Sequence, residues 1–518
     1  MNQRIRLSEE NRRWWTLAAM CFALFMVMLD NTVVNVALPS IQRSFDASLS
    51  SLEWTINAYS LAFAVFLVTG GRLGDIFGRR KVFLIGVVVF AAASATIGFA
   101  PSEGWLVASR AVQGLGAALM MPGTLSIITN TFPPAERGRA IGTWAGVSAI
   151  ALALGPLLGG WLTEDVSWRA IFFINLPVAA VAVVVTLFAT HESRDETATR
   201  EVDIPGIAAL TVGLTALVLA LVQANSWGWG SARIIGLFAV AVVGLLAFVT
   251  IERRSRAPIV DFTFFKSRSF VGANVVAFAI SFGMFAVFFF LALYMQNILG
   301  YSPLETGVRF LPSTLVIMVA GPLSGRLADR VGPRTPLVIG LSLVTVSLAW
   351  QSRIQVDTSF GFLVVPFILL GLGMGFTMSP MSTAAMNAVD RSKAGVASGT
   401  LSMTRMVGGT FGVAALGALV AAIGRHDLAK SLPGVPHDTR EKLVEALGGR
   451  LPDATAQIRD ASQQAFVDAL GTGLTIAAFA LLAAALVAWL MVNPKRPDAE
   501  LPVEVEVLPE ATPAGTVA

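Results

Sequence analysis

The sequence predicts an all-α integral membrane protein with fourteen transmembrane helices. Hydrophobic residues make up 55% of its 518 residues and charged residues only 14%, whereas a soluble domain carries about 25% charged residues. Many stretches run uncharged for more than the ~18 residues that mark a membrane helix. These runs are too long and too uniform for the alternating strands of a membrane barrel.

Fourteen apolar segments support this architecture. The first follows Arg12 and Arg13, is too long for the apolar core of a signal peptide and has no small-residue cleavage site. The segments lie at roughly 14–38, 54–71, 82–102, 104–130, 140–163, 170–190, 204–224, 234–251, 269–297, 306–325, 335–352, 358–386, 394–424 and 469–492.

The positive charges predict the orientation of these segments. An even number of spans places both termini on one side of the membrane. Most of the 37 Lys and Arg residues fall in the loops that would lie inside if the N-terminus is cytoplasmic. The positive-inside rule therefore predicts a multi-pass protein of the cytoplasmic membrane with both termini in the cytoplasm.

An internal repeat predicts a division into two halves. GRLGDIFG (Gly71–Gly78) recurs as GRLADRVG (Gly325–Gly332), in the loops after spans two and ten. Short Gly-Arg-Asp loops also recur by coincidence, but equivalent loops eight spans apart favour two six-helix halves with two helices inserted between them. The predicted regions are a cytoplasmic N-terminus (1–13), an N-terminal half (14–190), two inserted helices with their linkers (191–268), a C-terminal half (269–492) with an extracytoplasmic loop (425–468), and a disordered tail (493–518).

Composition and missing motifs exclude several functions. One cysteine, Cys21, cannot form a disulfide or a thiolate cluster within the chain. The net charge of +4 reflects membrane topology, so no nucleic-acid partner is expected. The sequence has no P-loop, nucleophile-elbow or HExxH motif. We therefore expect no enzyme activity, no metal and no organic cofactor.

Three ionisable residues lie well inside the predicted spans: Asp30, Arg110 and Arg405. Such residues cost ~2.5–3.5 kcal/mol on insertion scales and are candidate functional groups. Asp30 lies ~12 Å and Arg110 ~9 Å below the outer ends of their spans, so they can pair. The alternative is a static pair that only orders two helices.

Arg405 lies near the middle of its span, and no carboxylate lies well inside any span of its half. It can either contact a substrate or serve helix packing. The three histidines, His191, His426 and His437, all lie in predicted loops. Proton coupling would therefore rest on carboxylates.

Small residues mark the fifth span. Their spacing permits close approach of a second helix, and Pro156 predicts a kink. Such a helix suits a seam between moving parts, although this pattern is common in membrane helices. The glycines are Gly142, Gly146, Gly155, Gly159 and Gly160.

These segments together resemble the major facilitator superfamily, and within it the fourteen-span drug:proton antiporters of the EmrB/QacA type. LDNTVVNVALP (Leu29–Pro39) is similar to the first-span motif, with Asn31 where threonine is more usual. The other similar stretches are GRLGDIFGRRK (Gly71–Lys81), RAVQGLGAA (Arg110–Ala118), GPLLGG (Gly155–Gly160) and WRAIFFINLP (Trp168–Pro177).

The resemblance implies alternating access around a cavity lined by spans 1, 4, 9 and 12, and proton-driven efflux. It implies that Asp30 is the coupling or substrate-binding carboxylate and Arg110 its partner. Asp75 would be a gate charge that holds the start of span 13 near residues 392–394. The implied gating motif comprises Gly71, Asp75, Gly78, Arg79, Gly325, Asp329 and Gly332, and the implied antiporter motif comprises Gly146, Gly155, Pro156, Gly159 and Gly160.

We therefore expect an antiporter that exports amphipathic small molecules and uses the proton as its coupling ion, embedded in the lipid bilayer. Alternatives are a dedicated exporter of one endogenous metabolite, lipid or peptide, and a non-transporting receptor on the same fold. The sequence leaves the oligomeric state open, with a monomer as the working assumption.

Two further expectations concern substrate charge and the outer loop. Asp30, Arg110 and Arg405 leave the deep charges net positive, which favours neutral or weakly anionic substrates over dicationic ones. The outer loop is expected to form a cap with helical pieces around 439–447 and 454–470, with a passive linker as the alternative.

Overall fold

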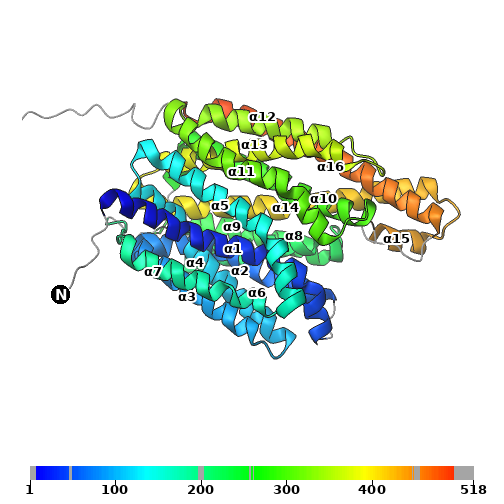
Figure 1. The fold of residues 1–518 in the computed structure, drawn as a ribbon, viewed down its shortest axis with the longest axis horizontal. Coiled ribbons are helices and arrows are strands. Elements are labelled where there is room, and N and C mark those ends of the chain that lie inside the picture. Colours follow the sequence, from blue (N-terminus) through cyan, green and yellow to red (C-terminus); the bar gives the residue numbers. More distant parts are fainter. Residues whose placement is uncertain are drawn as a thin grey trace, which may run out of the picture.

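The computed structural model describes residues 8–45, 49–196, 203–255, 258, 260, 262–445, 447 and 455–494. These residues form a bundle of long helices (Figure 1), and no strand occurs among them. The first group comprises α1 (Glu9–Phe45), α2 (Leu49–Phe77), α3 (Arg79–Gly98), α4 (Glu103–Thr131), α5 (Pro134–Trp161), the π-helical turn η1 (Leu162–Val166), α6 (Ala170–Phe173) and α7 (Asn175–Ala189).

The remaining elements follow in chain order. After the pair α8 (Ile204–Trp227) and α9 (Ala232–Glu252), the second group contains α10 to α14 and α16. Its elements are η2 (Phe262–Lys266), α10 (Arg268–Leu293), η3 (Tyr294–Ile298), α11 (Pro303–Val331), α12 (Arg334–Gln351), α13 (Phe360–Asn387), η4 (Arg391–Lys393), α14 (Ala394–Ser431), α15 (His437–Glu445) and α16 (Ala456–Met491).

The helices have the length and the apolar surface of a membrane protein. Twelve of the described helices are long and apolar enough to cross a bilayer, and α5 and α12, which pack against neighbouring helices, are not among them. Large apolar side chains such as Phe188 and Phe479 are well exposed on the outside. Lipid tails can solvate such side chains. The expected all-helical membrane architecture is therefore confirmed.

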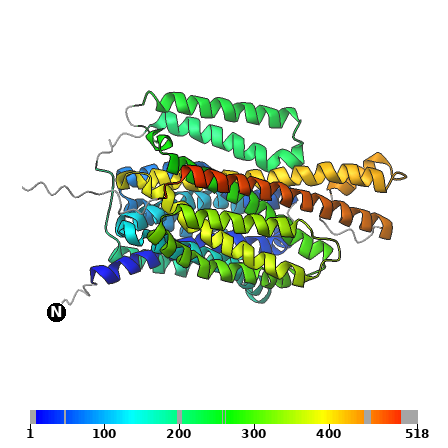
Figure 2. The same cartoon turned by 90° about the horizontal axis from the view of Figure 1, so that it is seen from above.

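Helix contacts divide the bundle into two groups joined along two seams. Within the first group α1 packs on α5 and α7, and α4 packs on α2 and α3. Within the second group α13 packs on α11 and α12, and α16 packs on α10, α12 and α14. The seams are α5 against α11 and α2 against α14. The α8–α9 pair lies to one side of the bundle (Figure 2), where α8 contacts both α2 and α14.

The repeated motif is helical, not a loop as the sequence predicted. Helix α2 continues to Phe77 and α11 continues to Val331, so both motif aspartates lie in the last turns of their helices. The chain then turns at Gly78 with φ 109° and at Gly332 with φ 84°. Glycine adopts such positive φ values without the steric cost that a Cβ brings. We call this end of the bundle the motif end.

The opposite end carries a cap. Helices α14 and α16 have 38 and 36 residues, well beyond the ~20 that cross a bilayer core. With α15 they project past the other helices (Figures 1 and 2). Leu428, Leu443 and Ala465 belong to a separate small apolar core there.

The cap differs in part from the expected one. The helical piece expected around 439–447 corresponds to α15. The piece expected around 454–470 is not separate from the last span, because α16 runs without a break from Ala456 to Met491. The tail expected to be disordered lies outside the described residues from position 495 onward.

Candidate functional site

Asp30 and Arg110 form a buried ion pair in the first helix group. Arg110 Nη1 of α4 donates to Asp30 Oδ2 of α1 over 2.5 Å, and the two residues are 1% and 0% exposed. The pairing expected from their depth is therefore present. Removing one partner of such a buried pair costs about 3–5 kcal/mol, because the other charge is left uncompensated.

Further groups hold the Arg110 guanidinium in place. Nη1 also donates to Gln113 Oε1 over 2.6 Å, and Nε donates to the Thr55 carbonyl oxygen over 3.1 Å. The Tyr59 ring lies under the guanidinium, 4.3 Å from ring centroid to Cζ. The cation is thus bound by charge, by hydrogen bonds and by an aromatic face.

Neutral side chains complete the coordination of Asp30. Gln113 Nε2 and Asn175 Nδ2 donate to Asp30 Oδ1 over 2.9 and 3.1 Å. Ser94 Oγ accepts from the same two amides over 3.3 and 2.9 Å. We call Asp30, Ser94, Arg110, Gln113 and Asn175 the Asp30 cluster. It joins α1, α3, α4 and α7.

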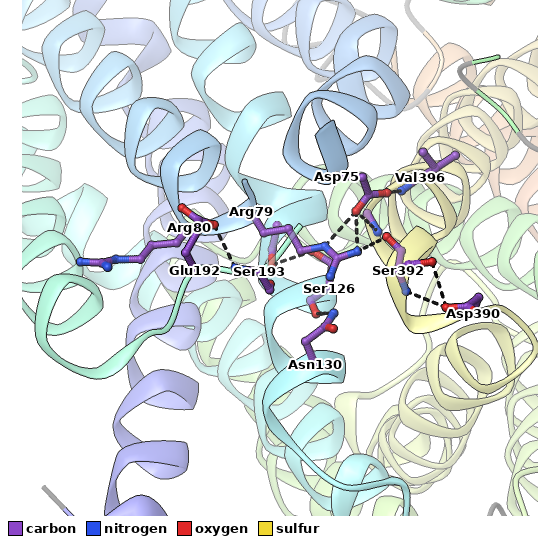
Figure 3. Close-up of polar contacts among 12 residues, drawn as sticks. Asp75, Arg79, Arg80, Ser126, Asn130, Glu192, Ser193, Asp390, Ser392 and Val396 are labelled. Carbon is purple, nitrogen blue, oxygen red and sulfur yellow. Dashed lines mark hydrogen bonds and ion pairs between the residues drawn. The ribbon is translucent and has the colours of Figure 1, made fainter. Parts of the chain in front are cut away.

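A second cluster, the Asp75 clasp, closes the α2–α14 seam at the motif end (Figure 3). Asp75 Oδ1 accepts from Gly395 N over 3.0 Å and Oδ2 accepts from Val396 N over 2.9 Å. These amides belong to the first turn of α14, where a carboxylate also benefits from the helix dipole. The contact lies one to two residues beyond the expected residues 392–394.

Arg79 completes the Asp75 clasp. Its Nε and Nη2 donate to Asp75 Oδ1 over 2.8 and 2.6 Å, and Nη2 also donates to the Ser392 carbonyl oxygen over 2.5 Å. Asp75 and Arg79 are 0% and 1% exposed. A Cβ at Gly71 would collide with the Gly395 carbonyl oxygen, so glycine permits this close contact.

The segment after α7 supports the same cluster (Figure 3). Glu192 accepts from Arg80 N over 3.0 Å and from Lys81 N over 3.2 Å, so it caps the N-terminus of α3. Ser193 O accepts from Arg79 N, and Asp195 N donates to Asp75 O. The chain that leads to α8 is thus bound to the clasp.

The second motif copy forms the Asp329 clasp across the α5–α11 seam. Asp329 Oδ1 and Oδ2 accept from Gly138 N and Arg139 N over 2.9 and 3.0 Å. Asp329 is half-buried. A Cβ at Gly325 would collide with the Gly138 carbonyl oxygen. Asp75 and Asp329 each lie two residues before the end of their helix. Each binds two consecutive backbone amides across its seam, in the first turn of α14 and in the second turn of α5.

The glycines of α5 face two different helices. Gly146 lies against Met318 of α11, whereas Gly155 and Gly159 lie against Thr32 and Val33 of α1. Added Cβ atoms at Gly155 would collide with Thr32, but one at Gly160 would meet nothing within 4 Å. The side chain of Pro156 lies outside the described side chains.

Arg405 stands apart from both clusters. It is a half-buried residue of α14, and its Nε is buried without an acceptor among the described residues. The neighbouring Thr404 hydroxyl donates to Asn274 Oδ1 over 3.1 Å. No interaction found among the described residues joins Arg405 to the Asp30 cluster.

Sequence reasoning found the charged members of the Asp30 cluster but missed the neutral ones. Depth in the membrane identified Asp30 and Arg110. A signal existed for Gln113, which follows Arg110 by three residues on one helix face, and for Asn175, a lone amide in an apolar run. Neither signal indicates which carboxylate these amides contact.

Comparisons with known proteins identify the family of the chain. The family model described as Major Facilitator Superfamily matches residues 20–413. The tetracenomycin C resistance and export protein of Streptomyces glaucescens is 37% identical over 96% of this chain and 94% of its own length. The multidrug resistance protein Stp of Mycobacterium tuberculosis is 35% identical over 92% of this chain and 91% of its own length.

A solved structure shares the fold at low identity. The proton:xylose symporter XylE, described as a major facilitator protein, superposes with a TM-score of 0.63, covering 95% of this chain and 98% of that chain at 12% identity. This likeness concerns the fold alone. The family match and the two curated relatives show that the chain belongs to the major facilitator superfamily of membrane transporters.

Proposed function

We propose that the protein is a proton-coupled antiporter that exports amphipathic small molecules across the cytoplasmic membrane by alternating access. The observation that carries this proposal is the buried Asp30–Arg110 pair inside a major facilitator fold. The names of the relatives, which describe antibiotic export and multidrug resistance, support drugs or antibiotics as the substrate class.

The finer topology belongs to the same proposal. Adding α5 and α12 to the twelve apolar helices gives fourteen spans in a 6 + 2 + 6 order, as in the EmrB/QacA type. The two equivalent clasps support halves related as a parallel repeat. Both termini and the motif end would then face the cytoplasm, as the distribution of basic residues favours.

The Asp30 cluster would couple proton movement to transport. When ionised, Asp30 pairs with Arg110; when hydrated from outside, it can bind a proton and weaken that pair. One inward charge supplies about 2.3 kcal/mol per 100 mV, which sustains accumulation on the order of fifty-fold per proton. The proton is the only coupling ion that this scheme needs, and a monomer suffices for it.

The clasps would act as the inner gate. Both lie at the motif end, and both bind the start of a helix from the other half. Their closure supports a state sealed toward the cytoplasm. Return to the inward-facing state would require both sets of hydrogen bonds to open.

The charges near the substrate path would set selectivity. Asp30 is already neutralised by Arg110, and Arg405 adds a cation whose Nε lacks an acceptor among the described residues. We therefore propose that neutral or weakly anionic amphipathic molecules are preferred over dicationic ones. Competition among matched neutral, monocationic and dicationic compounds tests this preference.

A substrate screen in proteoliposomes under an imposed pH gradient tests the transport function. An antiporter moves protons in the direction opposite to the substrate. Collapse of the pH gradient should therefore stop accumulation of the substrate. A receptor on the same fold would produce no proton flux. A dedicated exporter of one endogenous metabolite would respond to a single compound of a chemically diverse panel.

A further inference from the structure

Asn175 contacts Asp30 but has no role in the coupling scheme proposed above. It begins α7, inside the WRAIFFINLP stretch, and it is 1% exposed. Its Nδ2 donates both to Asp30 Oδ1 over 3.1 Å and to Ser94 Oγ over 2.9 Å. A polar amide this deep in an apolar segment needs such partners to offset its desolvation.

The other atom of this amide has no partner. Asn175 Oδ1 is buried, and no described donor reaches it. Burying a carbonyl oxygen without a hydrogen bond costs free energy, and such an oxygen can accept from any donor that comes within reach. An ionised Asp30 offers no donor, since a carboxylate only accepts. A protonated Asp30 does offer one.

The remaining acceptor beside Asp30 is already in use. Gln113 Oε1 accepts from Arg110 Nη1 over 2.6 Å. Rotation of the Asn175 amide by half a turn would place Oδ1 where Nδ2 now lies, within hydrogen-bond distance of Asp30 Oδ1. One amide atom is without a hydrogen bond before the rotation, and one is without a hydrogen bond after it. The rotation therefore does not increase the number of unpaired amide atoms.

The surroundings of Asp30 contain few competing charges. Arg110 of α4 and the Tyr59 phenol of α2 are the titratable groups that face it in the described chain. From α7 it meets the neutral Asn175, which also bonds Ser94 of α3, and α5 meets α1 nearby through Gly155 and Gly159. The Asn175 amide is therefore well placed to respond to a proton on Asp30.

We infer that Asn175 is a positioning residue that follows the protonation of Asp30: it donates to the ionised carboxylate and, after rotation of its amide, accepts from the protonated one. This inference rests on the proposed coupling role of Asp30. The proton binds Asp30 Oδ1, the new O–H donates to Asn175 Oδ1, and Arg110 keeps its charge. The start of α7 thereby registers the protonation of Asp30.

Infrared difference titration of the full-length protein in nanodiscs tests the inference. The carboxyl band lost in Asp30→Asn identifies Asp30. In Asn175→Leu, which has a similar shape but neither donor nor acceptor, the C=O stretch of the protonated Asp30 should move to higher wavenumber, because its O–H loses the Asn175 acceptor. Asn274→Leu is the matched control, because Asn274 is a buried amide of α10 with no contact to this cluster, and it should leave that frequency unchanged.

A second variant covers the case in which Asn175→Leu does not fold. Asn175→Asp is nearly isosteric and places two carboxyl groups at hydrogen-bond distance, so a broad infrared absorption from a proton shared between them should replace the Asp30 band. An unchanged C=O frequency in Asn175→Leu, or no shared proton in Asn175→Asp, overturns the inference. Failure of the proposed function shows separately, as gradient-driven transport by Asp30→Asn.

Discussion

The two motif clasps use aspartates at equivalent motif positions to bind two consecutive backbone amides of a neighbouring helix, yet they differ in burial and in charge. Asp75 is fully buried and is bound by Arg79 four residues later. Asp329 is half-buried, and the residue four positions later is Pro333. One seam is therefore closed by a buried ion pair together with backbone amides, whereas the other has Pro333 at the position that corresponds to Arg79.

This difference indicates an unequal division of gating between the seams. Breaking a buried ion pair costs about 3–5 kcal/mol, whereas a carboxylate at a helix start contributes ~0.3–1 kcal/mol and up to ~2 when partly buried. The α2–α14 seam should therefore control the gate, and the α5–α11 seam should adjust it. Closely packed glycines line both seams, as at Gly71 and Gly325, so packing alone does not separate them.

The largest expected effect is that of Asp75→Asn. The substitution keeps the side-chain size but leaves the Arg79 guanidinium buried without its carboxylate. The motif end should open in most molecules. A reporter at Leu67→Cys, a fully buried site on the α2–α14 seam, on a Cys21→Ser background, should then react with maleimide at least about tenfold faster. Wild-type labelling rates in this variant would contradict the control of the gate by this seam.

Arg79→Gln should have an intermediate effect. Asp75 keeps the amide donors Gly395 N and Val396 N, so part of its stabilisation survives. The Leu67→Cys reporter should react several-fold faster than in the wild-type background, but more slowly than with Asp75→Asn. A rate equal to that of Asp75→Asn would mean that the guanidinium carries the whole clasp.

Asp329→Asn should have a smaller effect. The substitution removes the negative charge that faces Gly138 N and Arg139 N. The lost interaction should destabilise the closed seam by ~0.3–1 kcal/mol, as expected for a partly exposed site. A reporter at Ser379→Cys, whose native hydroxyl donates to the Gly138 carbonyl oxygen, should react up to about fivefold faster. If this variant opens the gate as fully as Asp75→Asn does, the two seams are equal and the comparison is wrong.

The smallest effect should come from Asp390, which binds Ser392 of the Asp75 clasp. The backbone N–H of Ser392, and then its hydroxyl, donate to the exposed Asp390 carboxylate and hold its pKa below the ordinary value. The folded pKa lies below the unfolded value of about 3.9, so this stabilisation is present above that pH and is lost as the pH falls through the folded pKa.

Thermal unfolding checks this sign. The unfolding midpoint of Asp390→Ala should lie slightly below that of the wild type near neutral pH. The difference should shrink as the pH falls below about 4 and vanish once the pH lies below the folded pKa of Asp390. Asp427, a half-buried carboxylate of α14 in the cap, provides the control Asp427→Ala. A difference for Asp390→Ala that does not depend on pH would argue against the carboxylate as its source.

Parts of this arrangement could be predicted from the sequence. Depth along a helix is a one-dimensional quantity, so the pairing of Asp30 with Arg110 followed from span ends and rise per residue. The ends of helices were harder to predict, because a run of polar residues after an apolar span is typical of a loop. In the structure α2 continues through Arg72 and Asp75 to Phe77, and the first turn of α14 satisfies the Asp75 carboxylate.

The remaining features depend on contacts between distant segments. Asn175 reaches Asp30 across 145 residues of sequence, and no local pattern encodes that contact. The segment 456–468 is rich in Ala, Gln and Asp and reads as an outer loop, yet it extends α16 because Ala and Gln favour helix and Ala465 packs in the cap core. The unequal burial of the two clasps also required the folded structure.

Gradient-driven transport by Asp30→Asn in proteoliposomes tests the coupling role of Asp30 most directly. The variant keeps the side-chain size and removes the only carboxylate of the Asp30 cluster. We predict that it still exchanges labelled substrate down its own gradient, but that an imposed pH gradient no longer drives accumulation. Accumulation at the wild-type rate in Asp30→Asn would contradict the account.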